Sequence, residues 1–164
     1  MEASVETLKA ILDGFNAHDL DRIMSFFSED CVLEMPRGPD PWGSRAVGIA
    51  AVREGLRSRF TGIPDVHYGD DSHFACGNIG VSQWTLRGTK VDGERIEVRG
   101  CDFYTFRNGK IVKKDSYWKI QERYLPSVAA RVQAPWLISR SRFWRRGAGA
   151  AQIGRGREGL IVCD

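Results

Sequence analysis

The sequence has no long apolar run, and this absence excludes a membrane-spanning protein. None of its apolar segments approaches the roughly 20 residues that a helix needs to cross a bilayer. The N-terminal stretch Met1–Glu6 is acidic at first and lacks the basic region followed by an apolar one that marks a secretory signal peptide. We therefore expect a cytoplasmic protein that has no membrane partner.

Metal-binding patterns are absent as well. The four cysteines, Cys31, Cys76, Cys101 and Cys163, form no C-x-x-C pair, and their spacings match no zinc motif. None of the three histidines has a second histidine two or four residues away, which a compact metal site on a strand or helix would need. We therefore expect no metal site.

Lysine is missing after residue 125, and the charge of the chain is unevenly distributed. Residues 1–125 carry 17 Lys and Arg against 19 Asp and Glu, whereas residues 126–164 carry 7 Arg and 2 acidic residues. The net charge of +3 therefore mostly reports the C-terminal segment. We expect one domain over residues 1–124, followed over residues 125–164 by a basic tail rich in Arg, Gly and Ala that is peripheral or partly disordered.

This tail has one feature that raises the question of nucleic-acid binding. Phe143 and Trp144 lie among arginines, and such a mixture can hold phosphates and stack on bases. A tail without that role is the simpler interpretation, and we expect no nucleic-acid partner.

The first third of the chain has helical periodicity. Apolar residues three and four apart predict an amphipathic helix over residues 4–16, with Ser4 as its N-cap. Similar spacing predicts helices from Leu20 to Phe27, with Asp19 as a cap, and from Ile49 to Phe60.

Between the second and third helices, the pattern predicts a short strand and a loop. Residues 31–35 form the strand, which Pro36 should end because proline cannot donate to a sheet. Residues 36–48 are rich in Gly and Pro and predict a loop, in which Trp42 is either an anchor or a cover over a pocket.

After Val66 the periodicity changes to that of strands joined by tight turns. Asp92-Gly93 and Asn108-Gly109 are favoured hairpin turns. The predicted strands are residues 66–75, 79–87, 96–106 and 111–120. Helices followed by an antiparallel meander indicate an α+β protein, with about three helices packed on one face of a curved antiparallel sheet.

Two stretches carry a family resemblance. Residues 15–21 with 26–32, and residues 100–111 with 115–118, resemble the nuclear transport factor 2-like superfamily in its SnoaL-like branch, which includes polyketide cyclases and ketosteroid isomerases. Together with the segments between them they cover residues 1–124. The resemblance implies a cone-shaped fold with a ligand pocket at its wide end and a homodimer formed through the outer face of the sheet.

Asp102 is the residue with the most specific chemical implication. The segment from Asp102 to Phe106 is similar to the one that in ketosteroid isomerase holds a protonated aspartic acid, which donates to a developing oxyanion. With Tyr104 and Phe106 on its own face, Asp102 should look into the cone, where a neutral acid can donate and a carboxylate can act as a base. The alternative is an ordinary carboxylate paired with Arg99 or Arg107.

Other residues of the family do not carry over. Met35 stands at the position expected for the isomerase base, and Ile11 at that of the oxyanion tyrosine. Alternation places Glu34 on the opposite face from Met35, which predicts a solvated or interface carboxylate. The water-activating aspartate of limonene epoxide hydrolase aligns with Ser116, and Asp115 is one residue away, so a hydrolase is a weak interpretation.

These residues predict a cofactor-independent acid–base enzyme of the isomerase, dehydratase or cyclase type, acting on a small apolar carbonyl or aromatic compound. The alternative is a non-catalytic module on the same fold that binds a small molecule or interacts with a partner. The predicted catalytic residues are Asp102, Tyr104, His73 and Ser116, and the predicted ligand-binding residues are Met35, Trp42, Trp84, Phe106 and Trp118.

Overall fold

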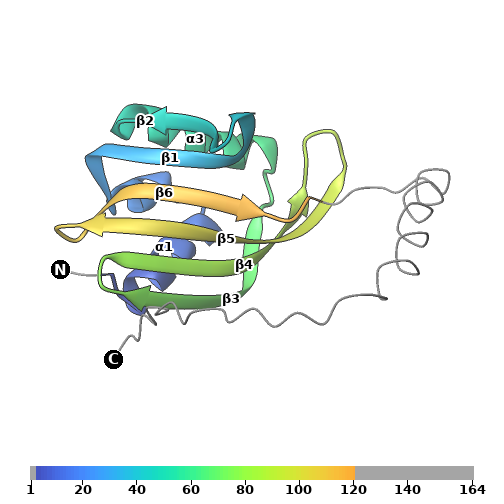
Figure 1. Ribbon diagram of the computed structural model, residues 1–164. Coiled ribbons are helices and arrows are strands. Elements are labelled where there is room, and N and C mark those ends of the chain that lie inside the picture. The colour runs from blue at the N-terminus through green and yellow to red at the C-terminus, as the bar shows by residue number, and fades with distance from the viewer. Residues whose placement is uncertain (1–2, 121–164) are drawn as a thin grey trace, which may run out of the picture. The chain divides into compact units, whose positions relative to one another are not determined.

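A computed structural model describes residues 3–120, which form three helices and a six-stranded sheet. The strand order is β2-β1-β6-β5-β4-β3, and the helices cover one face of the curved sheet (Figure 1). The helices are α1 (Val5–Asn16), α2 (Leu20–Met24) and α3 (Ile49–Gly62). The strands are β1 (Phe27–Asp40), β2 (Gly43–Val47), β3 (His67–Cys76), β4 (Ile79–Thr89), β5 (Arg95–Arg107) and β6 (Lys110–Trp118). The predicted α+β class is confirmed, whereas the predicted tail over residues 125–164 lies outside the described residues.

The strands from β3 to β6 pair antiparallel in sequence order, as the meander predicted. The turn between β5 and β6 is Asn108-Gly109, and both residues have positive φ, as a tight hairpin turn of the favoured hand requires. β1 pairs parallel with the other side of β6. Of the three helices, only α3 lies between strands in the chain, and it carries the chain from β2 at one edge of the sheet to β3 at the other.

The predicted helix caps are confirmed. The Ser4 side chain accepts a hydrogen bond from the Thr7 backbone N–H at 3.1 Å, and Asp19 accepts from Arg22 N–H at 2.9 Å. The second helix is shorter than expected because the chain enters β1 at Phe27, which pairs with Ile111 of β6 and is buried there.

The predicted loop over residues 36–48 is wrong. β1 continues through Pro36 to Asp40, and β2 returns along it after a turn at Pro41 and Trp42. Pro36 is tolerated because it lies where the β1–β2 register is irregular, between Met35 and Asp40, so no regular ladder bond is lost.

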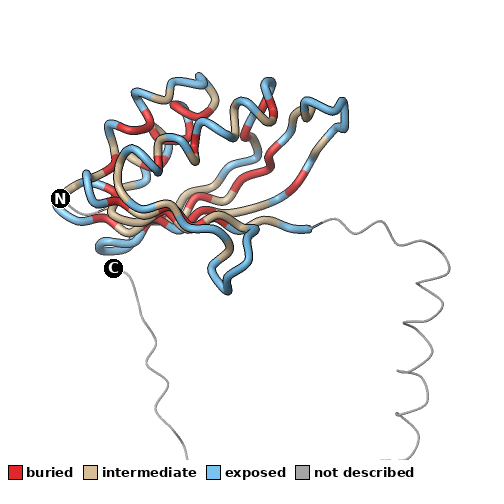
Figure 2. The backbone as a smooth tube through the Cα atoms, turned by 90° about the horizontal axis from the view of Figure 1, so that it is seen from above, coloured by how far each residue is buried: buried red, intermediate tan, exposed pale blue. Residues whose placement is uncertain are grey.

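The core lies between the helices and the inner face of the sheet, where buried segments from both layers meet (Figure 2). Leu8, Ile11 and Phe15 of α1 are buried against the sheet at helical spacing. Fully burying one such side chain stabilises the fold by about 1.5–3 kcal/mol. None of the helices in the described range is long and apolar enough to span a membrane.

Gly100 makes room for the largest side chain of this core. It pairs with Trp84 across β4 and β5, and a Cβ atom added to Gly100 would lie 2.4 Å from the Trp84 indole ring and 2.5 Å from the Tyr117 carbonyl oxygen. Trp84 can therefore lie across β5 because residue 100 has no side chain.

A buried carboxylate ties three strands together on the outer face of the sheet. Glu34 of β1 is bound by Arg45 of β2, at 2.5 Å between Nη2 and Oε1, and by Lys113 of β6, at 2.6 Å between Nζ and Oε2. Glu34 lies opposite Met35 as predicted, but it is buried rather than solvated. Burial raises the pKa of Glu34, and hydrogen bonds from Lys113 and Arg45 outweigh this, so the net pKa is below its ordinary value.

We expect Glu34→Gln to lower the free energy of unfolding at pH 7 by about 1–3 kcal/mol, because two cations lose a charged acceptor. Since the folded-state pKa is lowered, the stabilisation is complete above the unfolded value of roughly 4.3 and is lost as the pH falls through the folded value. Urea unfolding from pH 7 to pH 3 measures both effects. The exposed Glu54→Gln is the control, and a Glu34→Gln effect that does not change with pH would contradict the charge-based explanation.

We expect Gly100→Ala to destabilise the protein by about 1–3 kcal/mol through overpacking. The added methyl group must displace the Trp84 indole, so the tryptophan fluorescence of the folded protein should change as well. Gly62→Ala is the matched control, because no atom lies within 4 Å of a Cβ at Gly62. Equal stability of the two variants would show that Trp84 does not need the space at residue 100.

Candidate functional site

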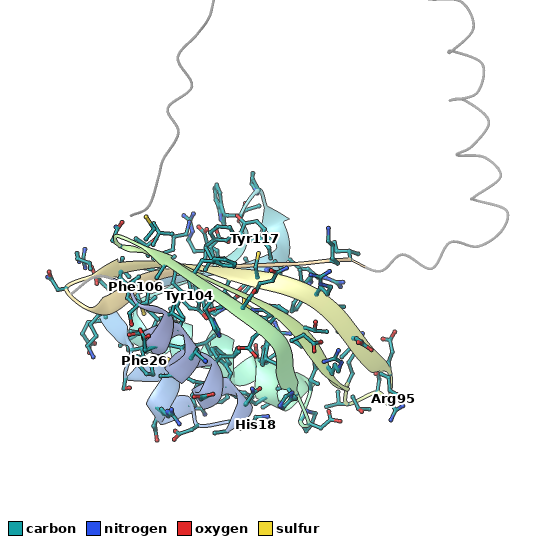
Figure 3. All side chains as sticks on the ribbon, turned by 90° about the horizontal axis from the view of Figure 1, so that it is seen from below. His18, Phe26, Arg95, Tyr104, Phe106 and Tyr117 are labelled. Carbon is teal, nitrogen blue, oxygen red and sulfur yellow. The ribbon has the colours of Figure 1, made fainter. Side chains whose placement is uncertain are left out.

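Asp102 lies in a row of inward-facing residues that crosses four strands. It pairs with Ser116 on β6 and with Ser82 on β4, and Ser82 pairs with His73 on β3. These four side chains are buried on the helix side of the sheet. Figure 3 shows Tyr104 on the same side and Tyr117 on the opposite one. The alternation of β5 therefore points Asp102 inward, as predicted.

The Asp102 carboxylate accepts four hydrogen bonds. Oδ1 accepts from Lys114 Nζ at 2.5 Å and from Ser116 Oγ at 2.7 Å. Oδ2 accepts from Trp84 Nε1 at 3.0 Å and from the Tyr104 hydroxyl at 3.3 Å. A carboxylate surrounded by donors acts as an acceptor, so the geometry favours a charged Asp102 over the neutral hydrogen-bond donor of the isomerase comparison.

Lys114 is the charged partner of Asp102, in place of the Arg99 or Arg107 considered from the sequence. Both side chains of this ion pair are only 6% exposed, and Lys114 Nζ also donates to Ser116 Oγ at 2.6 Å. Burial lowers the pKa of Lys114, although Asp102 opposes the shift. The pair is thus a buried acid and base in direct contact.

The sequence pattern did contain a signal for Lys114, which the predicted site does not include. The alternation that sets Ser116 and Trp118 inward also sets Lys114 inward, but lysine is so rarely buried that its default place is the surface. Ile111 also faces inward, three residues before Lys114. A bulge allows this, because Thr105 and Phe106 pair with Lys113 and Ile111 and leave Val112 as an extra residue.

The pair opens on a cavity between α3 and the sheet. The cavity has a volume of about 20 Å³, which is room for roughly one water molecule. Its buried end is polar, with Asp102, Lys114 and Ser116. The remaining lining residues are Phe15, Leu33, Met35, Gly55, Leu56, Arg59, Tyr68, Trp84 and Trp118. An apolar wall with a few convergent polar groups is the composition of a small-molecule site.

Arg59 and Trp118 both line this cavity and contact each other. The Arg59 guanidinium carbon lies 4.4 Å from the centre of the Trp118 ring, which joins α3 to the end of β6 by a cation–π contact. Both residues are half-buried, unlike the buried Asp102 and Lys114. They are therefore closer to solvent than the ion pair is.

The structure brings only part of the predicted site to the cavity. Among the predicted residues, Asp102, Ser116, Met35, Trp84 and Trp118 line it, whereas Tyr104, His73, Phe106 and Trp42 do not. Tyr104 lies beneath Asp102 as a donor, and Phe106 is buried in the core. His73 contacts Ser82 and Asp71, each at 2.9 Å. Trp42 is 44% exposed in the β1–β2 turn, where Arg45 covers its ring.

Both phenols near the ion pair keep their protons. Burial raises the pKa of Tyr104 well above its ordinary value, and the charge of Asp102 raises it further. Burial also raises the pKa of Tyr68, which lines the cavity. These tyrosines can donate hydrogen bonds at neutral pH but cannot supply a phenolate base.

No cluster of three His, Cys, Asp or Glu side chains that could hold a metal ion occurs within residues 3–120. The polar groups that the cavity offers to a ligand are thus those of Asp102, Lys114, Ser116, Arg59 and Tyr68, together with the indole N–H that Trp84 already gives to Asp102.

Comparisons with solved structures place this fold among known ones. A proposed polyketide cyclase from Pseudomonas putida KT2440 superposes with a TM-score of 0.64 at 20% identity, over 73% of this chain and 93% of that one. An NTF2-like protein of unknown function from Burkholderia pseudomallei K96243 has a TM-score of 0.61 at 21% identity, over 70% and 88%. TerC, co-crystallised with polyporic acid, has a TM-score of 0.61 at 21% identity, over 78% and 95%. Identities this low establish the fold alone.

Sequence comparisons give the family. A comparison with curated proteins returned no significant match. The model of the SnoaL-like domain matches residues 8–114, which is more than half of the chain and includes most of the cavity lining. The protein therefore belongs to the SnoaL-like domain family within the NTF2-like fold.

Proposed function

We propose that this protein is a cofactor-independent acid–base enzyme that acts on a small apolar compound bearing a carbonyl group. The observation that carries the proposal is the buried Lys114–Asp102 pair, which lines an otherwise largely apolar cavity. Buried pairs of an acid and a base cost free energy to desolvate, and groups of this kind cluster at functional sites. The fold's small-molecule cavity and the polyketide cyclase among its structural neighbours support the same class of chemistry.

The proposed step is proton removal next to a carbonyl group. The C–H bond breaks, its electron pair forms the double bond of an enolate, and the proton moves to the Asp102 carboxylate. The oxygen that becomes negative is held by the Lys114 ammonium, whose third N–H is not used by Asp102 or Ser116. Donors already in place where charge develops lower the barrier without having to reorganise.

The enolate can then follow three routes, which the same residues serve. Return of the proton at another carbon is an isomerisation, loss of a hydroxide from the neighbouring carbon is a dehydration, and attack on a second carbonyl carbon closes a ring. All three need an acid and a base and no redox cofactor, in agreement with the acid–base groups that the cavity offers.

A non-catalytic binding module is the second candidate, and one observation favours it. The Asp102 carboxylate has about four acceptor positions, and protein donors already use all of them. A carboxylate held in this way is well suited to fix Lys114 as a ligand-binding cation, and catalysis would require it to give up one of these bonds.

Hydrogen–deuterium exchange of a bound ketone separates the two candidates. We expect the full-length protein in D₂O to accelerate exchange of the α-protons of 2-tetralone, followed by proton NMR. Lys114→Met and Asp102→Asn should each lower the rate by about 10²–10⁴-fold, which is the usual contribution of general acid–base catalysis.

Lys113→Met is the control for this experiment, because Lys113 lies on the other face of the same strand and binds Glu34. It should retain the exchange rate of the unaltered protein. Binding of 2-tetralone without accelerated exchange would contradict the enzyme and favour the binding module, and so would equal rates in all three variants.

We also propose that the outer face of the sheet forms the homodimer that the resemblance implies. Phe103 and Tyr117 pack edge to face there with centroids 5.8 Å apart, yet they are 45% and 53% exposed. Exposed aromatic residues of this kind gather at protein interfaces.

We expect analytical ultracentrifugation to show a dimer of the full chain and a monomer for Phe103→Asp, because a charge would be buried in the interface without a partner. Val91→Asp changes an exposed residue in the turn between β4 and β5 and should remain dimeric. A monomeric unaltered protein would reject this proposal.

A further inference from the structure

The charges that line the cavity do not balance. Arg59 and Lys114 are cationic, Asp102 is the one anionic residue among the lining residues, and the rest are neutral. Asp102 is already paired with Lys114, so the positive charge of Arg59 is left over. A cavity with low-dielectric walls and an excess of one sign concentrates ligands of the opposite sign.

Among the partners that residues 3–120 provide, Arg59 has no acidic one, unlike the other arginines of its helix. On α3, Arg53 binds Asp21 and Arg57 binds Glu54, each within ion-pair distance. In the part of the chain that the structure describes, no carboxylate forms an ion pair with Arg59, whose side chain rests on the Trp118 ring instead. Its planar set of donors thus faces the cavity without an acidic acceptor.

The charge of Arg59 also affects the pKa values of two other residues that line the cavity. Its charge contributes to lowering the pKa of Lys114, after burial, and it opposes the rise in the pKa of Tyr68. Lys114 has three N–H donors, of which two go to Asp102 and Ser116. The third N–H of Lys114 and the Arg59 guanidinium are therefore the cationic donors available to a group that enters the cavity.

From this geometry we propose that the ligand carries a deprotonated acid group, a carboxylate or an equally acidic enol, which binds between Arg59 and Lys114. This inference rests on the proposed small-molecule site and names the class of its ligand. The apolar body of the ligand would lie against Trp84, Trp118, Leu56 and Phe15, and the acid group would take the place of the Trp118 ring as the partner of Arg59.

An anionic ligand also explains how a cavity of about 20 Å³ can be opened. Ligand pockets usually measure about 300–1,000 Å³, so half-buried side chains must move before a ligand can bind. A cation–π contact at a partly exposed site contributes about 0.5–2 kcal/mol, whereas a two-pronged bond between Arg and a carboxylate is stronger and more specific. An acid group can therefore draw Arg59 away from Trp118 more readily than a neutral ligand of the same shape can.

The test compares 2-naphthoate with 2-naphthamide, which have the same shape and differ in charge. Ligand-observed NMR titrations of the full-length protein should show that the carboxylate binds about tenfold more tightly than the amide. In Arg59→Gln the two probes should bind about equally, and the amide should still bind. In Arg57→Gln the preference for the carboxylate should be unchanged. Circular dichroism checks that both variants are folded, as expected for side chains that are not in the core.

Equal affinities for the two probes in the unaltered protein, no binding of either, or a preference that survives Arg59→Gln would each overturn the inference. The exchange of 2-tetralone, a neutral ketone, reports the Lys114–Asp102 chemistry separately. Absence of exchange together with an Arg59-dependent preference for the carboxylate would reject the enzyme and support the acidic ligand. Exchange without such a preference would support the enzyme and reject the acidic ligand.

Discussion

The buried ion pair between Lys114 and Asp102 is the interaction on which the inner face of this protein depends. Removing two charges from water costs several kcal/mol for each ion, and the attraction between them compensates only when other hydrogen bonds complete the site. Trp84, Tyr104 and Ser116 provide those bonds. Trp84 can reach Asp102 because Gly100 leaves space for its ring, and Lys114 faces inward because it lies two residues before Ser116 on β6.

The two adjacent lysines of β6 show how a sheet can use both of its faces. Lys113 holds Glu34 on the outer face together with Arg45, and both of these cations are partly exposed to solvent. Lys114 holds Asp102 on the inner face, with neither side chain more than 6% exposed. The outer pair joins neighbouring strands, whereas the inner pair places charge beside a cavity, where it can act on a ligand. The same residue type thus joins neighbouring strands at one position and lines a cavity at the next.

The small volume of the cavity and the four hydrogen bonds to Asp102 have related consequences for the site. Four donors hold the carboxylate in place, and Arg59 with Trp118 leaves the adjacent space the size of about one water molecule. Without a ligand, the polar end is therefore preorganised and shielded from bulk water, which strengthens its electrostatic interactions. A ligand that displaces Arg59 from Trp118 would meet donors already aligned, and an acid group provides the free energy for that displacement in the proposal made above.

The sequence by itself determined the three helices, the meander from β3 to β6, the caps at Ser4 and Asp19, the Asn108-Gly109 turn and the inward direction of Asp102, Ser116 and Trp118, because these depend on local geometry and on the periods of helix and strand. It also sufficed to recognise the SnoaL-like family. Only the tertiary structure decided that β1 continues through Pro36, that Lys114 rather than Arg99 or Arg107 pairs with Asp102, and that Tyr104, His73, Phe106 and Trp42 do not line the cavity. These features depend on which strand lies beside which and on what fills the space between the helices and the sheet. A linear pattern indicates the face of each side chain, but its neighbours on other strands come from distant parts of the chain and are set only when the sheet forms.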